Sequence, residues 1–199
     1  ALRGDSELIE TLLAHGANPD VQLTKGSTLK HDRRAFAFDK FLIGATPFSL
    51  AARRSDVGIM RLLATAGANT SLPLKDGQTA VMVAAAGRTT GLRRLRLGED
   101  QILETVRVGL DLGVEVNAVS QSGDTALHVA AASSFESVIR LLADRGGSLR
   151  ARNSLGQTPL AVALAPPRPP RELLEVRRWR DTENNTKSGR LVTGTHRSR

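Results

Sequence analysis

Two apolar phrases alternate along the chain at a regular spacing. The first is a threonine followed by small and apolar residues, and it occurs at 46–52, 79–85, 125–131 and 158–163. The threonines that open it are 33, 46 and 33 residues apart. The second is a Leu-Leu pair shortly before a glycine, found at 12–18, 62–69 and 141–146, with a looser version at 110–114. Such a period predicts stacked units, each too small to bury its apolar face alone.

Each phrase predicts one short helix. The hydroxyl of the opening threonine is expected to accept a backbone N–H at the start of the first helix. A left-handed glycine is expected to end each second helix, namely Gly16, Gly67, Gly113 and Gly146. Alanine pairs such as Ala51-Ala52 allow neighbouring helices to approach closely. Gly77, Gly123 and Gly156 stand at equivalent turns and are expected to share a positive φ.

These residues resemble the ankyrin repeat, which has a β-turn, a helix opening on Thr-Pro-Leu-His-x-Ala, a second helix and a closing Gly-Ala-Asn. Thr125-Ala126-Leu127-His128 and Gly16-Ala17-Asn18 carry the two motifs. The resemblance covers roughly residues 1–164 and implies an all-α solenoid of helix-turn-helix repeats joined by β-turn loops. Below family level, the layout looks like bacterial ankyrin proteins with an enlarged loop near the start.

The repeat register predicts the domain organisation. A half repeat at 1–18 precedes a finger insertion at 19–41 and repeats at 42–69, 74–117, 120–149 and 153–164, with a second insertion near 88–101. A Pro-rich segment with a candidate capping helix follows at 165–180, and a disordered basic tail at 181–199. The chain starts within a motif, which favours truncation over a native start. A signal peptide could have been lost with the missing part, so the sequence predicts no compartment.

The charge is unevenly distributed. Of the formal net charge of +8, residues 166–199 carry +5 and residues 1–165 carry +3. Arginine outnumbers lysine 23 to 5, which a GC-rich genome explains better than nucleic-acid binding does. One Trp and no Tyr offer little for base stacking, so nucleic acid is disfavoured as a partner. No apolar run approaches the ~20 residues of a membrane span.

Candidate chemistry is sparse. His128 occupies the family's Thr-x-Leu-His position, where the imidazole is expected to bond backbone between repeats. His31 could act as a general base beside Asp32, but no nucleophile accompanies it, so a solvated loop charge is favoured. The chain has no cysteine, no metal-ligand spacing, no phosphate-binding glycine pattern and no Gly-x-Ser-x-Gly elbow. The sequence therefore predicts no enzyme, no cofactor and no metal.

The insertions hold two further clusters. Phe36, Phe38 and Phe41 lie close together in the finger, either as its own small core or as a ligand-binding patch. The small core is favoured because leaving phenylalanines in water forgoes roughly 1.5–3 kcal/mol each. Four arginines in the second insertion, Arg88, Arg93, Arg94 and Arg96, form either a solvated loop, which is favoured, or a phosphate-binding surface.

The resemblance implies that a rigid concave surface binds another protein, with the chain as a monomer. The residues that this register assigns to the surface are Ala45, Arg53, Arg54, Lys75, Asp76, Gln78, Ala86, Gln121, Ser122, Asp124, Ala132, Ser133, Ser154, Leu155 and Gln157. Two alternatives remain. The chain is a regulatory or structural segment of a longer protein with a catalytic domain, or its Arg-rich tail binds an anionic partner.

Overall fold

The computed structural model describes residues 6–25, 42–87 and 98–165. The chain divides into two compact units, Ala1–Leu164 and Ala165–Arg199. The described helices, all in the first unit, are α1 (Ser6–Ala14), α2 (Pro47–Arg53), α3 (Val57–Thr65), α4 (Ala80–Ala85), α5 (Glu99–Asp111), α6 (Ala126–Ser133), α7 (Glu136–Asp144) and α8 (Pro159–Leu164). No strand occurs among the described residues. The finger aromatics, the arginines of the second insertion, the candidate capping helix and the tail 181–199 lie outside them.

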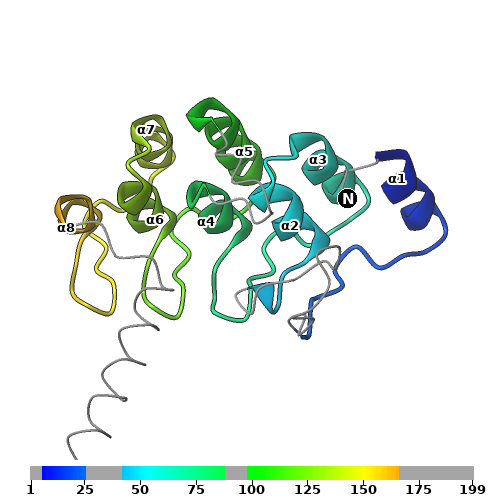
Figure 1. The fold of residues 1–199 in the computed structure, drawn as a ribbon, viewed down its shortest axis with the longest axis horizontal. Coiled ribbons are helices and arrows are strands. Elements are labelled where there is room, and N and C mark those ends of the chain that lie inside the picture. Colours follow the sequence, from blue (N-terminus) through cyan, green and yellow to red (C-terminus); the bar gives the residue numbers. More distant parts are fainter. Residues whose placement is uncertain (1–5, 26–41, 88–97, 166–199) are drawn as a thin grey trace, which may run out of the picture. The chain divides into compact units, whose positions relative to one another are not determined.

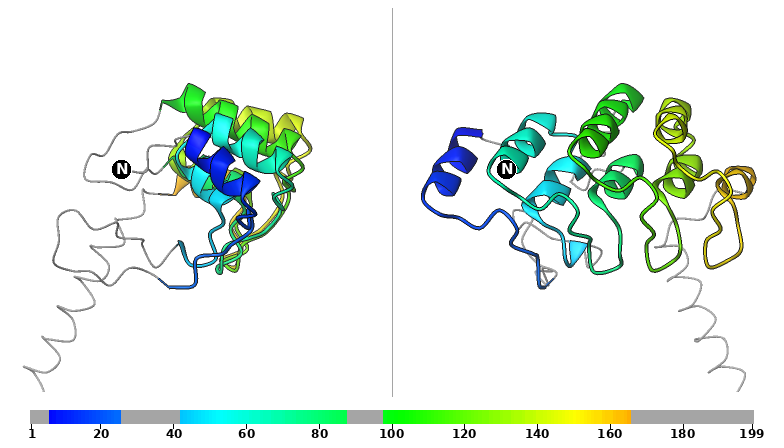
Figure 2. Two further views of the ribbon diagram at one scale, coloured as in Figure 1. Left: turned by 90° about the vertical axis from the view of Figure 1, so that its right-hand side faces the viewer. Right: turned by 180° about the vertical axis from the view of Figure 1, so that it is seen from behind.

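The helices of the first unit stand in two rows (Figures 1 and 2). Helices α2, α4, α6 and α8 form an inner row, and α1, α3, α5 and α7 form an outer row. Each inner helix from α2 to α6 packs on the outer helix that follows it, and successive inner helices pack on one another. Hairpin loops extend side by side from the inner row. This is the all-α repeat solenoid that the sequence predicts.

Threonine caps start most of the inner helices. The hydroxyl of Thr46 accepts the Ser49 N–H at 3.2 Å, and Thr79 and Thr158 accept the equivalent N–H at 3.4 and 3.3 Å. The fourth threonine differs from the prediction. The hydroxyl of Thr125 instead lies 2.9 Å from Nδ1 of His128, a ring acceptor that the other inner helices lack at this position.

Glycines take the left-handed conformation where the sequence predicts it. The four that end the outer helices have φ between 84° and 91°. Those at the hairpin turns, Gly77, Gly123 and Gly156, have φ of 78°, 72° and 71°. Ser55 and Ser134 adopt φ of 55° and 58° in the turn between inner and outer helix. This left-handed conformation costs a residue with a side chain more free energy than it costs glycine.

The core lies between the two rows. Phe48, Met82 and Leu127 from the inner helices are each 1 % exposed, and Met60 and Leu142 from the outer helices are fully buried. The alanine pairs of α2, α4 and α6 are at most 5 % exposed, consistent with the close helix approach that they predict. A smaller apolar cluster of Leu42, Ala45, Leu74 and Val83 lies under the hairpins of the second and third repeats.

Backbone hydrogen bonds locate the finger at the tip of the second repeat's hairpin. Leu23 N–H donates to Ala45 O at 2.9 Å, and Gly44 N–H donates to Leu23 O at 2.7 Å. The third repeat closes its ordinary hairpin with the same pair of bonds, from Leu74 to Gln78 and from Gly77 to Leu74. Residues 19–23 therefore belong to the repeat's own loop, and the insertion begins after Leu23 rather than at residue 19.

The second insertion also differs from its expected limits. Helix α5 begins at Glu99, so residues 99–101 are its first turn and not part of a loop. Helix α5 has 13 residues, whereas α3 and α7 have nine each. The extra residues of the third repeat thus lengthen the outer helix by about one turn as well as enlarging the connection before it.

Candidate binding surface

Main-chain hydrogen bonds join the hairpin tips, which are residues 75–76, 121–122 and 154–155. Lys75 N–H donates to Ile43 O at 2.9 Å, and Gln121 N–H donates to Asp76 O at 2.8 Å. Ser154 N–H then donates to Ser122 O at 2.9 Å. Each tip is therefore fixed to the next by a bond at the same register position. This ladder presents a preorganised edge, which loses little ordering entropy when it binds.

Side chains reinforce the ladder. The carboxamide of Asn153 donates to the Asp124 carboxylate at 2.9 Å, and its oxygen accepts the N–H groups of Leu155 and Gln157, both at 3.0 Å. Asn153 is 7 % exposed and so serves the hairpin rather than a ligand. Gln121 extends its amide to Lys75 O at 2.9 Å, which adds a second link between neighbouring tips.

The residues that the sequence assigns to the surface differ in exposure. Seven are exposed and are called the tip-and-helix face from here on: Arg54, Lys75, Gln121, Ser122, Ala132, Ser154 and Leu155. Seven are half-buried: Arg53, Asp76, Gln78, Ala86, Asp124, Ser133 and Gln157. Leu155 is 72 % exposed, which makes it the most apolar contact that this face offers.

Ala45 does not belong to the surface. It is 2 % exposed and packs in the small cluster with Leu42 and Leu74. The repeat register misplaced it because Ala45 stands where the neighbouring repeats carry polar residues, Gln78 and Asp124. Leu42, Leu74 and Val83 pack with Ala45 in this cluster, so the position is covered here.

The two acids of this region stabilise their own turns. Asp76 accepts the Gln78 N–H at 3.2 Å and its side-chain amide at 2.6 Å. Asp124 accepts the Ser122 hydroxyl at 2.7 Å in addition to the Asn153 bond. By contrast, neither Arg54 nor Lys75 forms an ion pair with any described residue. The charges available to a partner on the tip-and-helix face are therefore basic and lie in the second and third repeats.

His128 links two repeats, as the sequence predicts. Its Nδ1 accepts the Thr125 N–H at 3.1 Å, which requires the proton to be on Nε2. That Nε2–H then donates to Gln157 O at 3.0 Å, in the next hairpin. The ring is 1 % exposed. Its role is to hold the fourth and fifth repeats in register.

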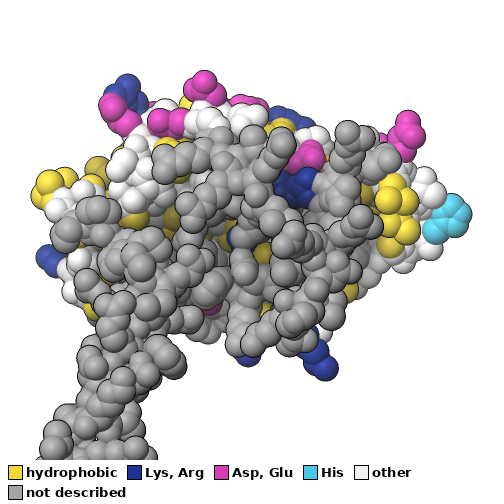
Figure 3. All heavy atoms as spheres, in the orientation of Figure 1, with side chains coloured by type: hydrophobic (Ala, Val, Ile, Leu, Met, Phe, Trp, Pro, Cys, Tyr) yellow, Lys and Arg dark blue, Asp and Glu magenta, His cyan; other side chains and the backbone are white. Residues whose placement is uncertain are grey.

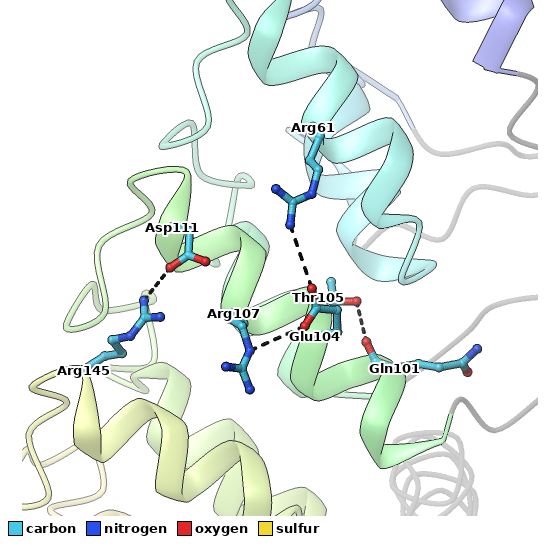
Figure 4. A network of polar contacts seen from close by, with 7 residues as sticks. All are labelled: Arg61, Gln101, Glu104, Thr105, Arg107, Asp111 and Arg145. Carbon is cyan, nitrogen blue, oxygen red and sulfur yellow. Dashed lines mark hydrogen bonds and ion pairs between the residues drawn. The ribbon is translucent and has the colours of Figure 1, made fainter.

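The opposite face is made of charged outer helices (Figure 4). Arg61 of α3 and Arg107 of α5 approach Glu104 at 3.9 and 3.5 Å, and Arg145 pairs with Asp111 at 2.8 Å. These side chains are 38–60 % exposed. Exposed pairs of this kind contribute about 0–1 kcal/mol each. This face is a suitable control surface for binding experiments because its charges already satisfy one another.

Several residues that position the surface were not identified from the sequence. Asp20 accepts the Asn69 N–H at 2.8 Å, and Asn117 accepts the Ser148 N–H at 2.8 Å while donating to Gly146 O at 3.0 Å. Asp20 and Asn117 each stand four residues after a helix-ending glycine, but Ser71 and Arg150 occupy that position in the other repeats, so the alignment gives only a weak signal. Glu99 bonds Ser137 in the next repeat and carries no comparable sequence signal.

Within the described ranges, no group of three or more His, Cys, Asp or Glu side chains is arranged to hold a metal ion. No helix in those ranges is long and apolar enough to cross a bilayer.

Comparison with known proteins bears on the repeats. A family model described as "Ankyrin repeats (3 copies)" matches residues 98–166. The chain is 32 % identical over 119 residues, 60 % of its length, to a "Transient receptor potential cation channel subfamily A member 1 homolog" of Caenorhabditis elegans. It is 33 % identical over 117 residues, 58 % of its length, to the "Ankyrin repeat and KH domain-containing protein mask" of Drosophila melanogaster. It is 36 % identical over 53 residues, 27 % of its length, to "Ankyrin repeat-containing protein P1E11.10" of Schizosaccharomyces pombe.

The matched segments span 9 %, 3 % and 26 % of these three relatives, all of which are eukaryotic. The bacterial type expected from the layout therefore stays a prediction. Ankyrin repeats are in general protein-protein interaction modules and typically non-catalytic. The family match identifies ankyrin repeats at residues 98–166, and the hairpin ladder, the threonine caps and the inter-repeat histidine are in keeping with it, so the chain contains ankyrin repeats.

Proposed function

We propose that this chain is a non-catalytic protein-binding module and that its partner docks on the tip-and-helix face. The observation that carries the proposal is the hairpin ladder, which holds successive tips by bonds of 2.8 to 2.9 Å. A surface so fixed presents several exposed side chains in constant relative positions. Partner recognition by such a face relies on complementarity rather than on folding upon binding.

The composition of the face favours a folded protein over nucleic acid. It combines two basic side chains with polar ones and a single exposed leucine at Leu155. Phosphate backbones call for many basic contacts, and base stacking calls for aromatic side chains, which this face lacks. The basic charges of the second and third repeats and the apolar Leu155 of the fifth offer a partner two chemically distinct anchors.

The test compares two sets of substitutions in the full chain. Arg54→Glu, Lys75→Glu, Ala132→Arg and Ser154→Arg alter exposed positions that make no side-chain hydrogen bond to a described residue. We expect this variant to fold normally and to lose binding at least tenfold, because hot spots concentrate near the centre of an interface. Asp124 is left unchanged because its carboxylate holds two neighbouring side chains of the hairpin.

The matched control carries Arg61→Ala and Arg107→Ala on the outer helices and should bind like the wild type. Partners are first captured from a lysate by the wild-type chain, and only those retained by the control and lost by the face variant count as specific. Affinity for a purified partner is then measured in a salt series, where a protein-binding face predicts a weak dependence.

One result would contradict the proposal. If the face variant binds normally while removal of residues 166–199 abolishes binding in a steeply salt-dependent way, the basic tail is the binding element and its partner is anionic. The tail carries a net charge of +5 in the sequence, so this outcome has a physical basis.

A further inference from the structure

Two basic side chains of the tip-and-helix face extend from fixed backbone. Lys75 N–H donates to Ile43 O at 2.9 Å, and the Lys75 carbonyl accepts the Gln121 side-chain amide at 2.9 Å. Arg54 is the C-cap of α2, and its N–H donates to Ala51 O at 3.0 Å. Both basic residues are exposed. Their positive charges are therefore presented from set points of the second and third repeats.

The acids nearest in sequence to these two cations are held by their own turns. Asp56 accepts the Ile59 N–H at 3.2 Å and so caps α3. Asp76 accepts the Gln78 N–H at 3.2 Å through one oxygen and the Gln78 side-chain amide at 2.6 Å through the other. Among the described residues, neither cation therefore has a carboxylate partner.

The basic residues of the outer helices are paired instead. Helices α3, α5 and α7 each contain one, and these are Arg61, Arg107 and Arg140. Each lies near a glutamate carboxylate, at 3.9, 3.5 and 2.6 Å respectively. Figure 3 shows acidic and basic side chains together along the outer helices at the top of the view, and basic side chains at the lower edge, where the hairpins lie. The tip-and-helix face thus offers an anionic partner cations that are not already paired.

The charge of the face changes along the array. Its members in the fourth and fifth repeats are the uncharged Gln121, Ser122, Ala132, Ser154 and Leu155. The half-buried Asp124 adds a negative charge in that part. The face is therefore basic in the second and third repeats and neutral to acidic in the fourth and fifth. Because interfaces pair potentials of opposite sign, such a gradient favours one orientation of the partner.

We propose that the partner is a protein with an acidic segment and that carboxylates of this segment lie over Arg54 and Lys75. This partner chemistry rests on the proposed function, because it describes what docks on the tip-and-helix face. An uncharged part of the same partner then faces Leu155 in the fifth repeat. Exposed ion pairs contribute little to affinity, so the two cations act mainly by raising the association rate and by fixing the orientation of the partner.

The first experiment uses a fluorescently labelled peptide of about ten glutamates, titrated with the full chain in about 20 mM salt, where screening is weak. Arg54→Gln with Lys75→Gln should weaken binding about tenfold, measured by anisotropy. Arg61→Gln with Arg107→Gln is the matched control, because it removes the same charge from the outer helices, and it should change binding less than about twofold. The basic tail is present in every variant, so its contribution is common to all.

Crosslinking provides a readout at one position. A water-soluble carbodiimide joins a glutamate carboxylate to a lysine amine as an amide when the two groups are in contact. Peptide mapping of the crosslinked chain should therefore find the peptide on Lys75. Arg54→Gln leaves this lysine intact and should lower the yield at Lys75, because one of the two charges that hold the peptide is lost.

A second comparison separates this partner chemistry from the proposed function. Ala132→Arg with Ser154→Arg alters the face without changing either cation, and it is tested beside Arg54→Gln with Lys75→Gln on the purified partner. If both variants bind that partner more weakly, the acidic segment and the docking face are both supported. If only the first variant does, docking on the face stands and the acidic segment is overturned. If neither does, the proposed function fails.

Three results of the peptide experiment overturn the proposal. Equal losses in the glutamine variant and in the outer-helix control show that net charge, rather than these two positions, attracts the peptide. Unchanged binding by the glutamine variant shows that the two cations take no part. An oligothymidylate of equal charge that binds more tightly than the peptide, through Arg54 and Lys75, shows that the face takes phosphate and that its partner is a nucleic acid.

Discussion

The carboxylate of Glu99, in the extra turn of α5, accepts two hydrogen bonds from Ser137 at the start of α7. The backbone N–H donates at 2.8 Å and the hydroxyl at 2.6 Å. Helix α7 begins after Phe135, whose side chain caps nothing, so Glu99 supplies from the preceding repeat the acceptor that α7 lacks. A carboxylate at a helix N-terminus also interacts favourably with the helix dipole. The lengthened α5 thus fixes the start of the next outer helix.

We expect Glu99→Gln to lower the thermal midpoint at neutral pH, because the neutral amide accepts more weakly from both donors. Asp100→Asn is the control, since Asp100 is exposed and makes no hydrogen bond to a described residue. Differential scanning fluorimetry of the two variants and the wild type measures the effect. Equal midpoints for all three would mean that the Glu99 bonds contribute nothing to stability.

The same contact predicts a pH dependence. The hydroxyl of Ser137 and then its backbone N–H stabilise the charged carboxylate, so the pKa of Glu99 lies below its ordinary value of 4.5. A group with a depressed folded-state pKa stabilises fully above its unfolded-state pKa and loses that contribution as pH falls through the folded-state pKa. The difference between wild type and Glu99→Gln should therefore be constant from pH 7 to about 5 and shrink below the ordinary value. Chemical denaturation at several pH values checks this.

Gly123 and Gly156 allow backbone strain to be separated from stacking. Their φ angles are 72° and 71°, so valine at either position meets the same left-handed penalty of about 1–2 kcal/mol. Only at Gly123 would the new Cβ lie 2.9 Å from the backbone of the next hairpin. We expect Gly123→Val to destabilise by about 1–3 kcal/mol more than Gly156→Val, because the hairpin must shift. If urea denaturation shows the same loss in free energy of unfolding for both variants, the hairpin next to Gly123 shifts without an energetic cost.

Ser55 is a position where a substitution should stabilise the fold. Its φ is 55°, and its hydroxyl is buried without a hydrogen-bond partner. Glycine removes the left-handed strain and the unsatisfied hydroxyl, and these gains exceed the roughly 0.5–1 kcal/mol of added chain entropy. We expect Ser55→Gly to raise the free energy of unfolding by about 1 kcal/mol. Ser134→Gly, with a φ of 58° and an exposed side chain, should gain less.

His128 should be the most sensitive polar residue of the array. Alanine at this position leaves the Thr125 N–H and Gln157 O without their partner, at about 1–3 kcal/mol for each buried group. We expect His128→Ala to destabilise by about 2–4 kcal/mol and to speed amide exchange in the fifth repeat. His15→Ala is the control: His15 is exposed just after α1 and its ring bonds only the Thr11 carbonyl one turn earlier, so its loss should change neither quantity. Unchanged exchange near Gln157 would show that the histidine does not couple the two repeats.

The elements of this fold could be read from the sequence because their causes are local. A threonine cap such as Thr46 and a left-handed glycine such as Gly67 act within one turn of the chain. The expected role of His128 followed from the repeat motif, because the motif itself encodes a contact between units. The exposed positions of the tip-and-helix face could be predicted for the same reason, because they occupy equivalent places in successive repeats.

Where the period is broken, only the tertiary structure decides. The register placed Ala45 on the surface, but it packs in the small cluster with Leu42 and Leu74. The second insertion conceals that three of its residues, 99–101, form the first turn of α5 and bring Glu99 to Ser137, a contact between groups 38 residues apart. The sequence was enough to predict a stack of helix-turn-helix repeats, because each unit of a repeated local pattern is too small to bury its apolar face alone and must pack on its neighbours. Which side chains are covered, and which helix ends are capped by another repeat, depends on packing between units, because those contacts join residues that no local pattern relates.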